Sequence, residues 1–281
     1  MPASRSRWMP TRSSASKNRL AKSRSAAMPN DTTLHSPGDD SMSLTASFHR
    51  DGYQIIRQAL DPAVVRDVGL FLEESLEAFR RSGSAEVEEH TRSGHFPLDV
   101  RLSPRLWELP RQESLQAILR DALGTQALFM HMPPTARFIE PGNPLAAVPA
   151  HQDVSYNRHM SDFLTVWIPF VPIDDACGGV TMFEGSQEFP ELLDDLSRDV
   201  WLKPVPTDGL RRIECQPMHP GDILLLNRWI IHESMPNRSS RPRLSIDLRF
   251  FGETARSTKH YLDCQSWTVV PPGGAGSGRV A

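Results

Sequence analysis

The 281-residue chain has only three cysteines, Cys177, Cys215 and Cys264, and no CxxC pair among them. Their number and spacing argue against a zinc ribbon or a disulfide framework, so each is expected to be a reduced and buried side chain. No apolar run approaches the roughly 18 residues that a membrane-spanning helix needs. These absences predict a cytoplasmic globular protein without a membrane segment.

Acidic residues are missing from the first 30 positions, where seven basic ones fall. This stretch has no apolar run long enough for a secretory signal. We expect residues 1–43 to form a disordered basic tail, with a transit peptide, an upstream extension of the reading frame or a nucleic-acid arm as alternatives. Removing these seven charges from the net charge of -3 leaves about -10 on the remainder, which argues against a nucleic-acid partner.

Two helices are expected early in the chain. Asp61-Pro62 is typical of a helix start, with Asp as N-cap and Pro at the first helical position. Apolar residues follow at helical spacing as far as Phe79, and Gly83 lies just past the end. A second helix is predicted from about 111 to 123, and residues 53–57 before the first helix are expected to form a strand.

Short strands dominate the rest of the chain, separated by turns rich in Gly, Pro, Asn and Asp. They are expected at 127–132, 163–171, 179–183, 212–216, 223–226, 229–232 and 243–251. This order predicts an α+β, mainly β protein with N-terminal helices, built around an antiparallel barrel or a double-sheet jelly roll. The folded domain is expected at 44–270, with a flexible tail at 271–281. The stretch 187–209 is expected to be a surface excursion, or else a lid.

His151 and Asp153 stand two residues apart and, on an extended strand, face the same side. A second histidine would complete a facial set of two imidazoles and one carboxylate, which suits Fe(II) with open positions. His232 ends a very apolar predicted strand and is the best candidate. His159 could be mistaken for this ligand, but its spacing fits a facial set less well than that of His232.

Beyond His232 the chain turns and returns as a strand that begins at Arg243. If the two strands pair as a hairpin, Ser234 and Arg243 become neighbours, and the guanidinium can clamp a carboxylate with the hydroxyl as a second donor. Spacing alone does not separate this arginine from its three competitors, which are Arg238, Arg241 and Arg249.

These motifs resemble, in order, those of the phytanoyl-CoA dioxygenase family of Fe(II)/2-oxoglutarate oxygenases. The resemblance runs from about His49 to Phe251. It is carried by His49 to Ile56, His151-Gln152-Asp153, Thr165 to Pro169, Gly178 to Ser186, Gly221-Asp222, and His232 with an arginine eleven residues on.

The resemblance implies a double-stranded β-helix (jelly roll, cupin-like) core flanked by the N-terminal helices, with iron held by His151, Asp153 and His232. It also implies that 2-oxoglutarate is bound by Arg243, with Ser234 and Thr165 beside it. O₂ is the co-oxidant, and the products from the cosubstrate are succinate and CO₂. Related halogenases have a small residue in place of the aspartate, so Asp153 favours a hydroxylase acting on a small organic molecule.

Four residues are weaker candidates for substrate binding, and for each a structural role is the alternative: Gln152, Trp167, Arg137 and His131. Tyr156, Asn157 and Arg158 follow the metal motif in a loop that could contact substrate. A catalytically silent jelly-roll binding protein is the alternative function. The resemblance says nothing of substrate identity or oligomeric state.

Overall fold

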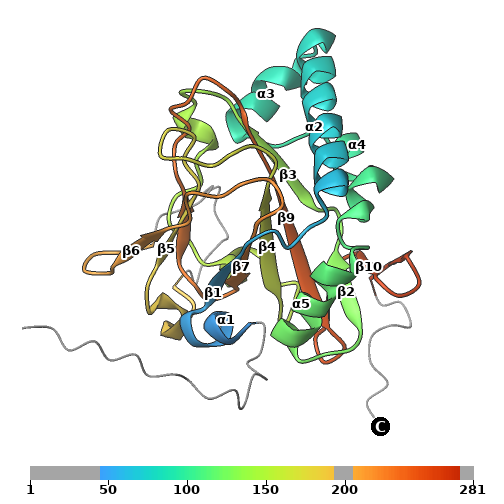
Figure 1. The fold of residues 1–281 in the computed structure, drawn as a ribbon, viewed down its shortest axis with the longest axis vertical. Helices are drawn as coiled ribbons and strands as arrows, with labels where there is room; N and C mark the ends of the chain where they lie inside the picture. The colour runs from blue at the N-terminus through green and yellow to red at the C-terminus, as the bar shows by residue number, and fades with distance from the viewer. Residues whose placement is uncertain (1–44, 193–204, 273–281) are drawn as a thin grey trace, which may run out of the picture. The chain divides into compact units, whose positions relative to one another are not determined.

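Two antiparallel sheets carry the fold in the computed structural model, which describes residues 45–192 and 205–272 (Figure 1). The large sheet has eight strands in the order β1-β7-β4-β9-β2-β10-β11, with β3 also paired to β9, and the small sheet has the order β6-β5-β8. The strands are β1 (Tyr53–Ile56), β2 (Leu128–His131), β3 (Thr135–Ile139), β4 (Leu164–Pro169), β5 (Val180–Phe183), β6 (Arg212–Glu214), β7 (Ile223–Asn227), β8 (His232–Ser234), β9 (Arg243–Gly252), β10 (Tyr261–Asp263) and β11 (Thr268–Val270).

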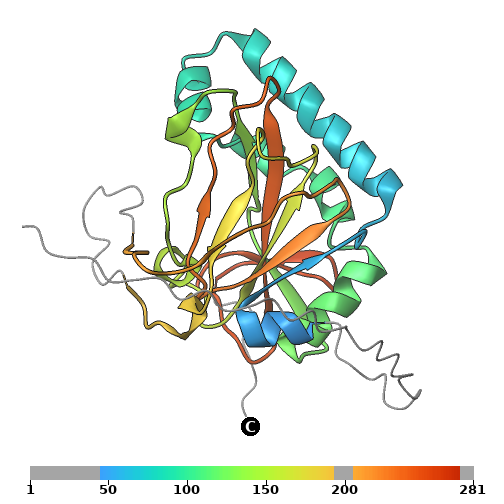
Figure 2. The ribbon, with the colours of Figure 1, turned by 60° about the vertical axis from the view of Figure 1, so that its left-hand side comes forward.

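Helices α2 and α5 lie on the side of the large sheet away from β5 and β6, as both ribbon views show (Figures 1 and 2). Helix α2 packs against β9, and α5 packs against β2 and β9. The helices are α1 (Ala46–Asp51), α2 (Pro62–Ser82), α3 (Glu86–Ser93), α4 (Leu98–Arg101), α5 (Glu113–Leu123) and α6 (Asp153–Tyr156), with short 3-10 turns at Pro104–Glu108, Pro144–Ala146 and Ser186–Glu188.

Helix α2 begins and ends where its local sequence predicts. The Asp61 carboxylate accepts a hydrogen bond from the Ala63 backbone N–H at 2.7 Å, and Gly83 ends the helix with a φ of 60°. Its buried side chains, Val65, Val68, Leu72 and Leu76, belong to the same core cluster as the apolar side chains of β7 and β9. The amphipathic pattern therefore docks this helix on the sheet.

Strand β9 separates an apolar face from a polar one. Leu244, Ile246, Leu248 and Phe250 are at most 2% exposed and belong to the main core. The alternating residues Arg243 and Arg249 instead reach Ser234 and Asp153, which lie outside the large sheet. Period 2 therefore gives this strand one face toward the helices and one toward the barrel interior.

The antiparallel sheets and flanking helices confirm the predicted fold class, and three local expectations are wrong. Residues 229–231 are not part of a strand, because β8 begins at His232. His151 and Asp153 do not share one strand: His151 lies in an isolated bridge, and Asp153 is the first residue of α6. Strands β8 and β9 do not form a hairpin, because β8 pairs with β5 in the small sheet and β9 lies in the large one.

Several expected features lie wholly or mainly outside the described residues: the basic tail at 1–43, the middle of the 187–209 stretch and the end of the 271–281 tail. Strands β3, β10 and β11 and helix α3 were not expected. Within residues 45–192 and 205–272, no helix is long and apolar enough to cross a membrane.

Replacing Asp61 by Ala should lower the free energy of unfolding by about 1 kcal/mol, because the Ala63 N–H loses its capping acceptor. The measurement is urea-induced unfolding followed by circular dichroism. Asp67→Ala is the matched control, since Asp67 is an exposed carboxylate within the same helix. Equal stability of the two variants would contradict the capping role.

Candidate metal centre

A backbone bridge brings two histidines together. The His151 N–H donates to the His232 carbonyl, and the His232 N–H donates to the His151 carbonyl, both at 3.0 Å. This reciprocal pair adds His151 to the edge of β8, beyond its pairing with β5. The two imidazole rings therefore lie side by side, with centroids 4.3 Å apart.

Each imidazole is oriented by a carbonyl two residues earlier in the chain. Nδ1 of His151 lies 2.9 Å from the Pro149 oxygen, and Nδ1 of His232 lies 3.1 Å from the Ile230 oxygen. A proton on Nδ1 leaves Nε2 as the metal-binding lone pair in both rings. Burial lowers the pKa of His151 to about 3, with the nearby His232 adding to the effect, so His151 is neutral as a ligand must be.

The Asp153 carboxylate completes the group from the start of α6. Thr165 donates its hydroxyl to Oδ2 at 2.5 Å, and Arg249 donates Nη2 to Oδ1 at 3.1 Å. Burial acts to raise the pKa of Asp153, but the Arg249 guanidinium, the two histidines and the Thr165 hydroxyl outweigh it. The net effect is a pKa well below the ordinary value, so the carboxylate stays ionised.

His151, Asp153 and His232 offer three ligand atoms that all lie within 4.8 Å of one another, and all three residues are buried. Across 45–192 and 205–272 they are the one group of three or more His, Cys, Asp or Glu residues with this geometry. Two imidazoles and one carboxylate are the donor set of a non-heme Fe(II) site. The residues present therefore fit iron.

Arg243 is the first residue of β9, at the opposite end of the strand from Arg249, and its side chain reaches β8 of the small sheet. Its Nη1 donates to the carbonyls of Gly178, Gly179 and Met235 at 3.0, 3.3 and 2.9 Å, and its Nη2 donates to Ser234 Oγ. Its Nε is buried without a partner in the described structure. Burial lowers the pKa of Arg243 to about 10, with the Arg137 charge contributing. A carboxylate that docks on the Nε–Nη2 edge would supply the missing acceptor and charge.

The Gly178-Gly179 pair allows this close packing. Gly178 has a φ of 65°, and a Cβ on it would lie 2.6 Å from the Pro236 carbonyl oxygen. A Cβ on Gly179 would lie 2.4 Å from Cys215 Sγ. Only glycine permits the backbone to approach the Arg243 guanidinium here.

Of the remaining residues that the sequence singled out, Thr165 contacts a candidate metal ligand, whereas Gln152 and Trp167 have structural roles. Thr165, expected beside the cosubstrate, gives its hydroxyl to Asp153 instead. Gln152 is fully buried, and its amide bonds the backbone of Pro190, Leu192 and Trp229, which is a structural role. Trp167 is 4% exposed and belongs to the main core.

In the described structure, Arg137 and His131 make no hydrogen bond or ion pair with the three ligands. Arg137 donates to the carbonyls of Ala146 and Ser93. The His131 ring contacts the ring of His159, with centroids 4.5 Å apart. His159 is the histidine whose spacing fits the metal-ligand set less well than that of His232. Asn157, which follows the metal motif, holds the Asp153 carbonyl at 2.9 Å.

Sequence reasoning considered Arg249 only as a rival of Arg243 and missed its contact with Asp153. The two-residue period of β9 was the available signal, because it puts both arginines on the interior face. The structure separates them: Arg243 reaches Ser234, and Arg249 reaches the candidate metal ligand.

Comparisons with known proteins give a family and a fold. The sequence matches the family described as phytanoyl-CoA dioxygenase (PhyH) over residues 48–245. It is 28% identical over 233 residues to the 1-deoxypentalenic acid 11-beta-hydroxylase of Streptomyces exfoliatus, an alignment that covers 75% of this chain and 81% of that protein.

Two solved structures share the fold. One is a non-heme monooxygenase, with a TM-score of 0.60, 17% identity and coverage of 77% of this chain and 81% of that one. The other is an epimerase from nogalamycin biosynthesis in complex with Fe3+ and alpha-ketoglutarate, with a TM-score of 0.56, 21% identity and coverage of 76% and 84%. At these identities the likeness establishes the jelly-roll fold.

Thr165→Val should weaken Fe(II) binding by about 10- to 100-fold, because the Asp153 carboxylate loses the donor that orients it. Anaerobic isothermal titration calorimetry measures the affinity. Thr181→Val is the matched control, since the Thr181 hydroxyl is buried without a partner in the described structure. If both variants bind iron as tightly as the native protein, the Thr165 hydroxyl does not orient a metal ligand.

Proposed function

The chain belongs to the phytanoyl-CoA dioxygenase family and is an iron- and 2-oxoglutarate-dependent oxidoreductase. We propose that it hydroxylates a small organic molecule. In this proposal iron(II) is held by His151, Asp153 and His232. The observation that carries it is the convergence of three buried donor atoms, from separate chain segments, within 4.8 Å.

When bound, iron(II) and 2-oxoglutarate supply the oxidising power for hydroxylation, with O₂ consumed and succinate and CO₂ released. The chain's own residues position and shield this chemistry. The backbone bridge holds the two imidazoles, while Thr165 and Arg249 fix the two carboxylate oxygens of Asp153. Both histidines are only 8% exposed, which limits the access of water to the donor atoms.

We assign Arg243 and Ser234 to the distal carboxylate of 2-oxoglutarate. Three backbone carbonyls fix the Arg243 guanidinium plane, and its unpartnered Nε leaves an edge for a bidentate contact. Arg249 is already committed to Asp153 and to the Thr135 hydroxyl. These contacts support Arg243 over Arg249 as the cosubstrate clamp.

Two observations support hydroxylation of a small molecule over the alternatives. The relative from Streptomyces exfoliatus is named as a hydroxylase of 1-deoxypentalenic acid, a small carboxylic acid. By the family resemblance, Asp153 stands where related halogenases have a small residue, which favours a hydroxylase. A catalytically silent binding protein would not require all of these donors to be kept together.

A cytoplasmic location forms part of the same proposal. Cys177, Cys215 and Cys264 are all free and buried. Burial raises the pKa of Cys215 to about 11 and that of Cys264 to about 12, so both thiols stay protonated and unreactive at neutral pH. Unpaired structural thiols suit a reducing compartment.

The purified protein with Fe(II), 2-oxoglutarate and air should release succinate, slowly without a substrate and faster with one. Chromatographic quantification of succinate checks this, with the His151→Ala variant as the inactive reference. Succinate formation at the same rate in the variant, or none in the native protein, would contradict the proposed function.

Arg243→Lys should raise the dissociation constant for 2-oxoglutarate about ten- to a hundredfold, because a bidentate charged contact becomes a single one. Fe(II) affinity should stay unchanged, since Arg243 makes no contact with the three metal ligands in the described structure. Arg241→Lys is the control, because Arg241 lies nearby on the surface beside Asp174. A larger effect from Arg249→Lys than from Arg243→Lys would reverse the assignment.

A further inference from the structure

A second cluster of basic side chains lies beyond the metal ligands on the wall of the barrel. Arg249 donates Nη1 to the Thr135 hydroxyl at 3.3 Å, and Arg101 donates Nε to the carbonyl of Pro134, the preceding residue, at 3.0 Å. The two guanidinium groups are therefore anchored on adjacent residues, and Arg249 also reaches Asp153. The cluster begins next to the candidate metal centre.

Two histidines complete the cluster. Nε2 of His159 lies 3.3 Å from Nδ1 of His131. Burial lowers the pKa of His131 to about 3, with the charges of His159, Arg249, Lys259 and Arg101 adding to the effect. Burial also lowers the pKa of His159 to about 4, followed by Lys259 and Arg249. Both rings thus lie near several positive groups and are neutral.

Carboxylates offset the charge of Arg249 but form no ion pair with Arg101 in the described part of the chain. The Arg249 charge is offset by Asp153, which is itself a candidate metal ligand. Asp247 lies on the same face of β9 and makes no hydrogen bond or ion pair in the described structure, and its charge acts on Arg137, Arg243 and Arg249. Arg101 forms no ion pair with any residue in 45–192 or 205–272 and is left with both Nη groups free.

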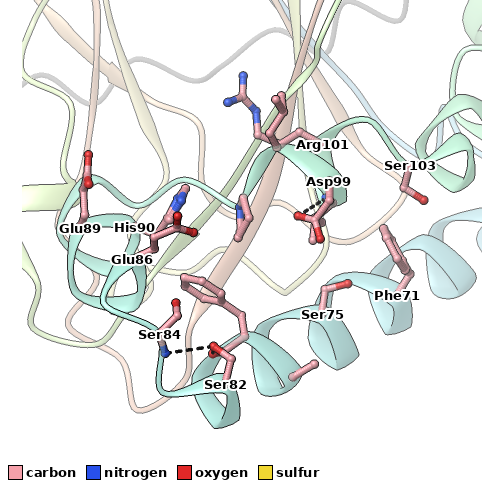
Figure 3. A pocket seen from close by; sticks show the side chains of 15 residues that line it. Phe71, Ser75, Ser82, Ser84, Glu86, Glu89, His90, Asp99, Arg101 and Ser103 are labelled. Carbon is pink, nitrogen blue, oxygen red and sulfur yellow. Dashed lines mark hydrogen bonds between the residues drawn. The ribbon is translucent and has the colours of Figure 1, made fainter.

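Arg101 projects from the end of α4, which packs against β3. It lines a groove of about 940 Å³ between α2, α3 and α4, whose lining also includes the carboxylates of Glu86, Glu89 and Asp99. The Arg101 guanidinium is turned away from the Asp99 carboxylate (Figure 3). Figure 3 shows its guanidinium on the far side of that groove from Ser75 and Ser82 of α2. The side chain is partly buried, and its pKa is lowered by burial and by the Arg249 charge. A half-buried cation of this kind is stabilised by an anion that arrives with a ligand.

We propose that Arg101 binds a carboxylate of the substrate, with His131 and His159 beside it, and so directs the other end of the molecule toward the metal. Two free Nη groups on an anchored guanidinium form a fork that matches one carboxylate. The cosubstrate does not need this fork, because Arg243 and Ser234 already form a separate carboxylate site at the opposite end of β9. This inference rests on the proposed function and names the substrate class as small organic acids.

The test uses the protein loaded with Fe(II) and 2-oxoglutarate without oxygen. The probes are benzoate, decanoate and adamantane-1-carboxylate, each paired with its primary amide, together with adamantyl phosphate. Calorimetry gives the dissociation constants. At least one carboxylate should bind about tenfold more tightly than its amide, the difference expected for a charge-assisted hydrogen-bonded contact.

In Arg101→Met this preference should disappear, while the affinity for the amide and for 2-oxoglutarate stays unchanged. Arg101→Lys keeps the charge without the fork and should retain part of the preference. Arg105→Met is the matched control, because Arg105 is an exposed arginine that stacks on Phe71. Thermal melting shows that each variant is folded, and the lysine variant decides the question if the methionine variant is not.

Two results with the native protein would overturn the proposal: no carboxylate binds more tightly than its amide, or adamantyl phosphate binds more tightly than adamantane-1-carboxylate. Two results with the variants would also overturn it: the preference for the carboxylate survives in both Arg101 variants, or Arg101→Met weakens the affinity for 2-oxoglutarate. None of these affects the visible absorption of the iron–2-oxoglutarate complex in the native protein. Loss of that absorption is the separate sign that the proposed function itself fails.

Discussion

The reciprocal hydrogen-bond pair between the backbones of His151 and His232 is the contact on which the candidate site depends. It joins two segments that are about 80 residues apart and sets the imidazoles with their centroids 4.3 Å apart. Because both backbone groups of each residue are used, the rings cannot separate without breaking two buried hydrogen bonds. The carbonyls of Pro149 and Ile230 then decide which ring nitrogen faces the metal.

The two sheets make different contributions to the site. The small sheet, with the bridged residue, supplies the histidines and Ser234, whereas β4 and β9 of the large sheet supply Thr165, Arg243 and Arg249. The cations of the large sheet thus face the two imidazoles and the carboxylate across the interior. Such fixed charges in a partly buried space interact more strongly than they would in water. The site is therefore suited to a metal and to anionic ligands.

Local patterns allowed much of the fold to be predicted. The Asp61 cap, Gly83 and the apolar spacing between them define α2, and the alternation along β9 gives its two faces correctly. The sequence also predicted that His151, Asp153 and His232 lie together. It did so on an incorrect local geometry, because Asp153 begins a helix instead of continuing a strand. The pairing of β8 with β5, and not with β9, depends on contacts between distant segments that no local pattern contains. For the same reason spacing did not reveal that Thr165 and Arg249 share the carboxylate of Asp153.

Anaerobic titration of the protein with Fe(II) and 2-oxoglutarate, followed by visible spectroscopy, tests the central claim most directly. A weak metal-to-ligand charge-transfer band should appear as both are added and saturate at one iron per chain, and it should be absent in His151→Ala. A native protein that binds both compounds without the band, or a His151→Ala variant that keeps it, would contradict the assignment of this site.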